Sequence, residues 1–354
     1  MSTQQAGRVQ TVTGLIDPDD LGITLMHEHL LLDVGAYFDE PGEAGIRAWV
    51  DAPLTVDKLG YIALYWHVNR DNTVILDERF AADQAERFML AGGRTVVDTT
   101  NVGLGRDPLA LARISRRTGL NIVMGSGYYV RLFHPADMAE RDEDRITGEI
   151  VRDITVGVGQ TGVRAGIIGE VGNMWPPQDD EVRALRAAAR AQIETGAAIT
   201  VHPGFDPQSP PSILDELGRA GADLSRVVMV HLDTFHDRGL LAELAASGCY
   251  LQWDTYGNEE TLFGEVGSGS GSALDMPSDE QRLDALEFVA GLGYLDRVLI
   301  SQDVFLKCMT VAYGSKGYGH IVTNILPRLL ARGWDGQQVE ALMVANPRRL
   351  LTLV

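Results

Sequence analysis

ITLMHEHL, residues 23–30, is a short apolar run with a His-Glu-His sequence in its second half. Seven similar runs, most bounded by Gly, Pro, Asn or Asp, follow it along the chain: RTVVDTT (94–100), NIVMGSGYY (121–129), AGIIGEVG (165–172), AAITVHPG (197–204), RVVMVHLD (226–233), CYLQWDT (249–255) and RVLISQD (297–303). Several are apolar throughout rather than alternating, which is typical of parallel strands covered on both faces. The sequence therefore predicts eight strands of this kind.

Segments with helical periodicity follow most of these runs, for example residues 77–90, 107–119, 179–196 and 277–293. Asp107 followed by Pro108 predicts a helix start, and Gly119 and Gly196 predict helix ends. Eight β-then-α units in one chain favour a closed (β/α)₈ TIM barrel, with a doubly wound sheet as the alternative. With no linker or charge block in view, we expect residues 1–354 to form a single domain.

Composition narrows the class of protein. The 354 residues are 45% hydrophobic and 22% charged, which are ordinary globular values. The net charge of −19 disfavours nucleic acids and anionic membranes as partners. Cys249 and Cys308 cannot build a disulfide framework, and the sequence has neither a signal-peptide core nor an 18-residue apolar run. We therefore expect a cytoplasmic protein that acts on a small molecule.

Histidines and carboxylates recur near the ends of the apolar runs, where barrel enzymes carry their chemistry. They are His27, His29, Glu170, His202, His231 and Asp303. Strand alternation places His27 and His29 on one face and turns Glu28 away. A single histidine at such a place is more often structural, but the joint recurrence favours metal ligands. Four histidines and two carboxylates predict two divalent ions, Zn²⁺ by default, with Mn²⁺ or Co²⁺ fitting the same ligands.

The segments LGITLMHEHL, GEVG, TVHPG, VHLD and ISQD resemble the phosphotriesterase family of the amidohydrolase superfamily, in the family's own order. The resemblance covers about residues 10–350, includes the late GYGHI and ANPRRLL segments, and is strongest to the glutamate-bridged, phosphotriesterase-related branch. It implies that His27 and His29 hold the more buried metal with Asp303. It also implies that His202 and His231 hold the more exposed one.

Two positions depart from the pattern of many family members. Glu170 stands at the bridging position that is a carboxylated lysine in many members, and the chain has no lysine between positions 58 and 307. We therefore expect the glutamate to bridge the metals without added carbon dioxide. Gln302 replaces a histidine that is common beside the ligand aspartate. Strand alternation points Gln302 away from the barrel interior, so we expect a minor effect.

The family mechanism implies that a bridging hydroxide attacks an electrophilic carbonyl or phosphoryl centre. Asp303 would accept the proton, and Asp233 either continues a proton relay or caps a loop. Tyr129 matches a tyrosine found near the metals in related lactonases, or is an ordinary rim aromatic. The Glu170 bridge and the GYGHI segment favour a carboxylic ester, lactone or amide over a phosphotriester.

The sequence also allows other functions and offers further candidate residues. A non-enzymatic, metal-containing small-molecule binder would keep the barrel, whereas a Rossmann dehydrogenase needs a glycine motif after a strand, which residues 268–273 do not offer. Arg131, Lys307 and His320 are weaker candidates for meeting an anionic substrate group.

The insert at 33–77 caps the site or supplies an oligomer contact, and we expect a homodimer. Residues 264–277 are expected to form a mobile loop near the barrel mouth.

Overall fold

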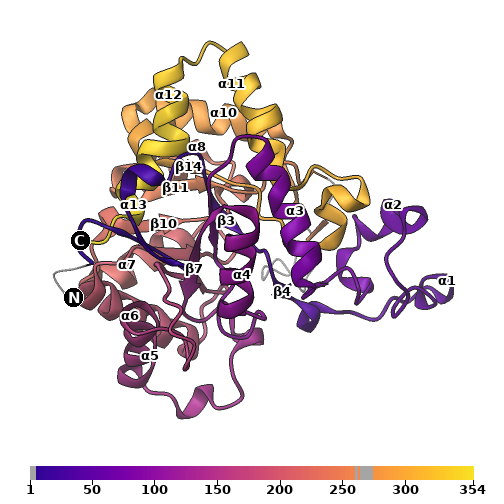
Figure 1. The fold of residues 1–354 in the computed structure, drawn as a ribbon, viewed down its shortest axis with the longest axis horizontal. Helices are drawn as coiled ribbons and strands as arrows, with labels where there is room; N and C mark the ends of the chain where they lie inside the picture. The colour runs from indigo at the N-terminus through magenta and orange to yellow at the C-terminus, as the bar shows by residue number, and fades with distance from the viewer. Residues whose placement is uncertain (1–4, 260–261, 264–273) are drawn as a thin grey trace.

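The computed structural model describes residues 5–259, 262–263 and 274–354. Each predicted run contains a strand, and the eight strands form one parallel sheet whose order follows the chain: β3 (Thr24–Glu28), β6 (Thr95–Asp98), β7 (Asn121–Ser126), β8 (Ile167–Gly172), β9 (Ile199–His202), β10 (Val227–Met229), β11 (Tyr250–Trp253) and β14 (Val298–Ile300). Helices surround these strands (Figure 1). The fold is therefore the predicted (β/α)₈ barrel rather than the doubly wound sheet.

The first and last strands, β3 and β14, meet through the buried side chain of Glu28. Its carboxylate accepts hydrogen bonds from the Ser301 hydroxyl (2.7 Å) and from the backbone amides of Gln302 (2.8 Å) and Val304 (3.0 Å). Burial raises the pKa of Glu28 to about 8. Glu28 thus points away from the pocket, as alternation predicted, and ties the two ends of the sheet together.

The helices lie outside the strands and in the chain segments between them. They are α1 (Ala44–Arg47), α2 (Leu59–Ile62), α3 (Glu78–Leu90), α4 (Pro108–Thr118), α5 (Glu143–Thr155), α6 (Asp179–Thr195), α7 (Ser209–Arg219), α8 (Arg238–Ala246), α10 (Asp279–Val289), α11 (Leu326–Ala331), α12 (Gly336–Glu340) and α13 (Asn346–Leu351). The Asp107 side chain caps α4 by accepting from the amide of Ala110. Gly119 (φ 74°) and Gly196 (φ 65°) end α4 and α6 in the left-handed conformation. Among the described residues, no helix combines the length and apolar character needed to cross a bilayer.

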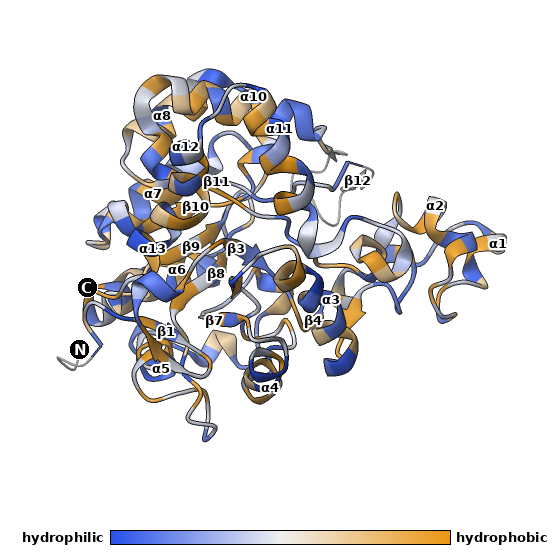
Figure 2. Cartoon of the chain, turned by 45° about the horizontal axis from the view of Figure 1, so that its top comes forward, coloured by the Kyte–Doolittle hydropathy of each residue, from blue (hydrophilic) through white to orange (hydrophobic). Residues whose placement is uncertain are grey.

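Successive strand residues belong to two different apolar clusters. Leu25, Val96 and Ile122 pack in the large cluster that includes the helices, whereas their neighbours Met26 and Val97 belong to a second cluster. Both sets are buried, which explains why the strands are apolar throughout. Apolar residues predominate in most of the strands, whereas apolar and polar residues alternate on the helices (Figure 2).

The insert at 33–77 begins and ends at a short antiparallel pair, β4 (Leu32–Asp33) with β5 (Val74–Ile75). Its far part, with α1 and α2, projects from the barrel (Figure 1). Its near part returns to the barrel mouth, where Tyr37 and Trp66 line the pocket. The insert therefore does cover part of the site. Two further pairs are β1 (Val9–Thr11) with β2 (Gly14–Ile16) and β12 (Leu262–Phe263) with β13 (Leu274–Asp275); most of the expected loop at 264–277 lies outside the described residues.

Candidate metal centre and pocket

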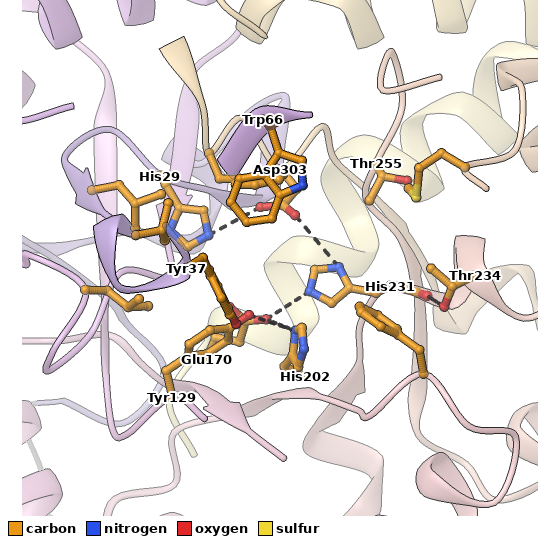
Figure 3. A pocket seen from close by; sticks show the side chains of 16 residues that line it. His29, Tyr37, Trp66, Tyr129, Glu170, His202, His231, Thr234, Thr255 and Asp303 are labelled. Carbon is orange, nitrogen blue, oxygen red and sulfur yellow. Dashed lines mark hydrogen bonds and ion pairs between the residues drawn. The ribbon is translucent and has the colours of Figure 1, made fainter. Parts of the chain in front are cut away.

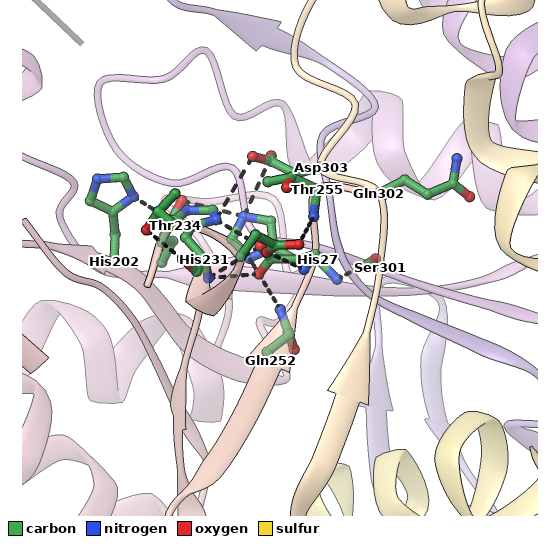
Figure 4. Close-up of polar contacts among 12 residues, drawn as sticks. His27, His202, His231, Thr234, Gln252, Thr255, Ser301, Gln302 and Asp303 are labelled. Carbon is green, nitrogen blue, oxygen red and sulfur yellow. Dashed lines mark hydrogen bonds and ion pairs between the residues drawn. The ribbon is translucent and has the colours of Figure 1, made fainter. Parts of the chain in front are cut away.

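The structure brings the six predicted metal ligands together at the carboxyl ends of the strands (Figures 3 and 4). Two of them, His231 (φ 55°) and Asp303 (φ 47°), are the only described non-glycine residues with positive φ. Such backbone costs about 1–3 kcal/mol per residue and is concentrated at functional sites. In both cases it turns the chain just beyond a strand and directs the side chain into the pocket.

Two strand irregularities place further ligands. The pairing register shifts between Leu25 and Glu28 in β3, and again between Ile168 and Val171 in β8. Leu25 and Ile168 both pack in the outer, helix-facing cluster, so strict alternation from them would turn His27 and Glu170 outward. The extra residue of a bulge reverses the alternation and points both side chains into the barrel.

Glu170 lies at the centre of the cluster. Its Oε1 is 3.0 Å from His202 Nδ1 and 3.0 Å from His231 Nε2, while its Oε2 is 3.6 Å from His27 Nε2. Although burial raises its pKa, the three histidines hold the pKa of this carboxyl well below its ordinary value. One ionised carboxylate therefore faces histidines of both predicted metal positions, as a bridging ligand must.

Asp303 faces the other pair of histidines. Its Oδ1 is 3.3 Å from His29 Nε2 and 3.6 Å from His27 Nε2. Potential ligand atoms of His27, His29 and Asp303 all lie within 4.8 Å of one another, as do those of His27, Glu170 and His231. These spacings are those of side chains converging on shared cations.

The surroundings of His27 test whether metal ions fit. The side chain is fully buried, and both ring nitrogens have no hydrogen-bond partner. A buried imidazole nitrogen without a partner is costly, yet here one nitrogen points at two carboxylates. A cation between these groups would satisfy the nitrogen and neutralise the carboxylates. The residues thus fit divalent metal ions.

A buried carboxylate behind the ligands, Asp254, orients His231. It accepts a hydrogen bond from His231 Nδ1 (2.8 Å) and another from Gln252 Nε2 (2.8 Å). Burial lowers the pKa of His231, but Asp254 and Glu170 together hold it well above its ordinary value. Because Nδ1 donates to Asp254, Nε2 is the nitrogen left to face Glu170 and a metal.

Asp233 does not occupy the place expected of a proton relay. It lies behind Asp254 and accepts hydrogen bonds from the Asp254 amide (2.9 Å) and from Nε of the fully buried Arg282 (2.9 Å). Arg282 also donates to Asp279 (3.2 Å). Asp233 is absent from the pocket lining. Of these two aspartates, Asp254 is the one that hydrogen-bonds His231, so a structural function of Asp233 fits the geometry better than the relay.

Tyr129 lies beside the candidate metal ligands. Its hydroxyl is 3.3 Å from His202 Nδ1, and it also interacts with the hydroxyl of Tyr37 from the insert. Burial raises the pKa of both phenols above their ordinary value. Both therefore stay protonated at neutral pH and are available as hydrogen-bond donors beside the metal site.

Sequence reasoning missed Asp254 as a functional residue. The same signal that marked Glu170 and Asp303, a carboxylate at the end of an apolar run, is present in CYLQWDT (249–255). Tyr37 and Trp66, both in the insert, were likewise not identified from the sequence as pocket residues. No local pattern shows that the insert at 33–77 folds back over the barrel mouth.

A (β/α)₈ barrel with histidines and carboxylates converging at the strand ends is the architecture of a metal-dependent hydrolase. The chain belongs to the phosphotriesterase family, whose model matches residues 7–351. It is 39% identical to a phosphotriesterase-related protein of Nematostella vectensis, over 98% of this chain and 99% of that protein. It is 36% identical to an N-acetyltaurine hydrolase of Dictyostelium discoideum, over 99% and 100%. Among solved structures, a resiniferatoxin-binding protein from Rhodobacter sphaeroides superposes with a TM-score of 0.93 and 38% identity, over 98% and 95% of the two chains.

Proposed function

We propose that this protein hydrolyses a carboxylic ester, a lactone or an amide with two divalent metal ions held by the six ligands. The observation that carries the proposal is the position of Glu170, which faces His27 through one oxygen and His202 and His231 through the other. The name of the N-acetyltaurine hydrolase relatives adds support for hydrolysis of an acyl bond.

His27, His29 and Asp303 would hold one metal ion, His202 and His231 the other, and Glu170 would bridge them. When bound, such a pair lowers the pKa of a shared water and so supplies hydroxide near neutral pH. Glu170 is negatively charged without the added carbon dioxide that a carboxylated lysine at this position needs.

The chain's own groups perform the remaining tasks. Asp303 is one of the proposed ligands and also lines the pocket. It would accept the proton released during attack on the carbonyl carbon. Tyr129 and Tyr37 remain protonated and would donate hydrogen bonds to a substrate oxygen, where negative charge develops during acyl transfer. Asp254 keeps His231 in one tautomer and orientation.

The decisive experiment is a hydrolysis screen of the metal-loaded protein with lactones, N-acyl amines including N-acetyltaurine, aryl esters and aryl phosphotriesters. Turnover of the acyl compounds supports the proposal. Preferred turnover of phosphotriesters would favour the phosphotriesterase alternative. Tight binding without turnover of any compound would favour a metal-containing binding protein.

Two matched variants test the proton acceptor. Asp303→Asn keeps the shape and an oxygen ligand but cannot accept a proton, so turnover should fall by about 10²–10⁴. Asp233→Asn, outside the pocket, should lower thermal stability yet leave turnover within about 10-fold. Metal content must be measured in both. Full activity of Asp303→Asn with both metals bound would show that the proton goes elsewhere.

A further inference from the structure

The wall of the pocket above the metal ligands is apolar. The cavity measures about 620 Å³ with its open mouth included, and its wall includes Leu32, Val34, Leu104, Phe205, Met276 and Phe305. Aromatic side chains hold one another in place along this wall. The ring of Trp66 lies 5.6 Å from that of Tyr37 and 5.6 Å from that of Phe305, both edge to face.

The two threonines of the pocket have hydrogen-bond partners within the protein. Thr234 donates its hydroxyl hydrogen to the carbonyl oxygen of His231 (2.8 Å). The hydroxyl oxygen of Thr255 accepts from Arg282 Nη2 (2.9 Å) and Nε (3.2 Å). Away from the metal ligands and the two tyrosines, the lining therefore offers little polar recognition.

No lysine or arginine lines the described pocket. The three cationic candidates from the sequence are each engaged by a carboxylate elsewhere. Arg131 lies 3.8 Å from Asp180, Lys307 pairs with Asp71, and His320 bonds Asp279 at 2.6 Å. The residues outside the described ranges, 1–4, 260–261 and 264–273, contain no Lys, Arg or His side chain.

An anionic group placed against this wall, away from the metal ligands, would lose its hydration and meet no lysine or arginine side chain, which is strongly unfavourable. The net charge of −19 further disfavours the binding of an anionic group. A neutral apolar group would instead gain from leaving water.

We infer that the pocket selects substrates whose group next to the scissile acyl bond is neutral and apolar, and that it discriminates against carboxylate- or sulfonate-bearing analogues such as N-acetyltaurine. This inference rests on the proposed hydrolytic function and specifies its substrate class. It distinguishes this chain from the activity named for its N-acetyltaurine hydrolase relatives.

Two compounds that differ in one group provide the test. N-acetyl-2-phenylethylamine and N-acetyltaurine carry the same acetamide on an ethyl chain, ending in phenyl or in sulfonate. We expect kcat/KM for the phenyl compound to be at least about 100-fold higher, as the burial of an unpaired charge predicts. Equal or higher kcat/KM for N-acetyltaurine would overturn the inference while leaving the hydrolytic function intact.

A binding measurement separates the two proposals if neither amide is cleaved. Quenching of tryptophan fluorescence by 2-phenylethanol and by 2-hydroxyethanesulfonate compares the same two groups without any reaction, because Trp66 lines the pocket. A dissociation constant at least about 10-fold lower for 2-phenylethanol supports the inference, even if the hydrolytic function fails. Equal affinity, or tighter binding of the sulfonate, overturns it.

A matched pair of variants at Phe205 tests the cause of the selectivity. Phe205 is half-buried, and its ring lies 5.4 Å from that of His202. Phe205→Arg supplies the missing cation and should raise the ratio of sulfonate to phenyl affinity by at least about 10-fold. Phe205→Met keeps the wall neutral and should leave that ratio near the wild-type value. An unchanged ratio in a folded Phe205→Arg protein, or an equal change in Phe205→Met, would contradict the electrostatic explanation.

Discussion

Replacing Asp254 by asparagine tests whether the buried layer behind the metal ligands controls metal binding. Asp254 accepts from His231 Nδ1 at 2.8 Å and from the His231 amide at 3.1 Å. Loss of such a partner typically reduces metal affinity 10- to 100-fold, or about 1.4–2.7 kcal/mol. We expect Asp254→Asn to lower the affinity for the metal ion proposed at His231 by this amount.

The fold should survive the substitution. Asparagine has nearly the shape of aspartate, and its oxygen still accepts from His231. Its new side-chain NH₂ group would face Gln252 Nε2, which now donates to Asp254 at 2.8 Å. Two hydrogen-bond donors would then point at each other. Gln252 Oε1, however, is buried without a hydrogen-bond partner. Rotation of the Gln252 amide therefore provides an acceptor for the new donor.

Asp279→Asn is the matched control, because this carboxylate is likewise buried and hydrogen-bonded, to Arg282 and His320, but contacts none of the metal ligands. Metal affinity is measured for each variant by competition with a chelating dye at neutral pH, alongside thermal unfolding. Asp279→Asn should lower stability and leave metal affinity within about 3-fold. Wild-type affinity in Asp254→Asn, or an equal loss in both variants, would refute the reasoning.

Three further predictions follow from the buried groups. Glu170→Gln should lose most metal binding and turnover while its circular dichroism stays unchanged; wild-type metal content and activity would exclude the bridging role. Arg282→Met should lower the free energy of unfolding by about 3–5 kcal/mol, because Asp233 then stays buried without a counter-charge; a loss below about 1 kcal/mol in urea unfolding would contradict this. Burial raises the pKa of Tyr37 and Tyr129, so the stability these phenols contribute below their unfolded pKa of about 10 is lost as pH rises beyond it. Ultraviolet titration near pH 10 should therefore show less tyrosinate in the folded than in the urea-unfolded protein, and equal amounts would contradict the burial argument.

Much of the fold could be predicted from the sequence because the signals are local. Parallel strands with helices on one side and barrel core on the other must be apolar on both faces, so each appears as a short apolar run. Asp107 and Gly119 mark the ends of α4 because capping depends on neighbouring residues only. The six ligands could be named for a related reason: buried strand ends tolerate polar residues only where they have partners.

The orientation of these ligands was decided by the tertiary structure. Alternation places His27 with Leu25 and Glu170 with Ile168, on the outer face, and only the register shifts in β3 and β8 turn them inward. A bulge leaves no simple mark in the sequence because it depends on pairing with the neighbouring strand.

The surroundings of the metal centre also depend on contacts between distant segments. Asp233 and Asp254 are both acidic residues near strand ends, but Arg282, 49 residues beyond Asp233, binds Asp233 and leaves Asp254 to orient His231. Tyr37 and Trp66 reach the pocket because the insert folds back over the barrel mouth. The sequence by itself thus determined the barrel and the residues of its candidate metal site, since both follow from local pattern and burial. Packing between distant segments decided which carboxylate supports a ligand and what kind of wall a substrate meets.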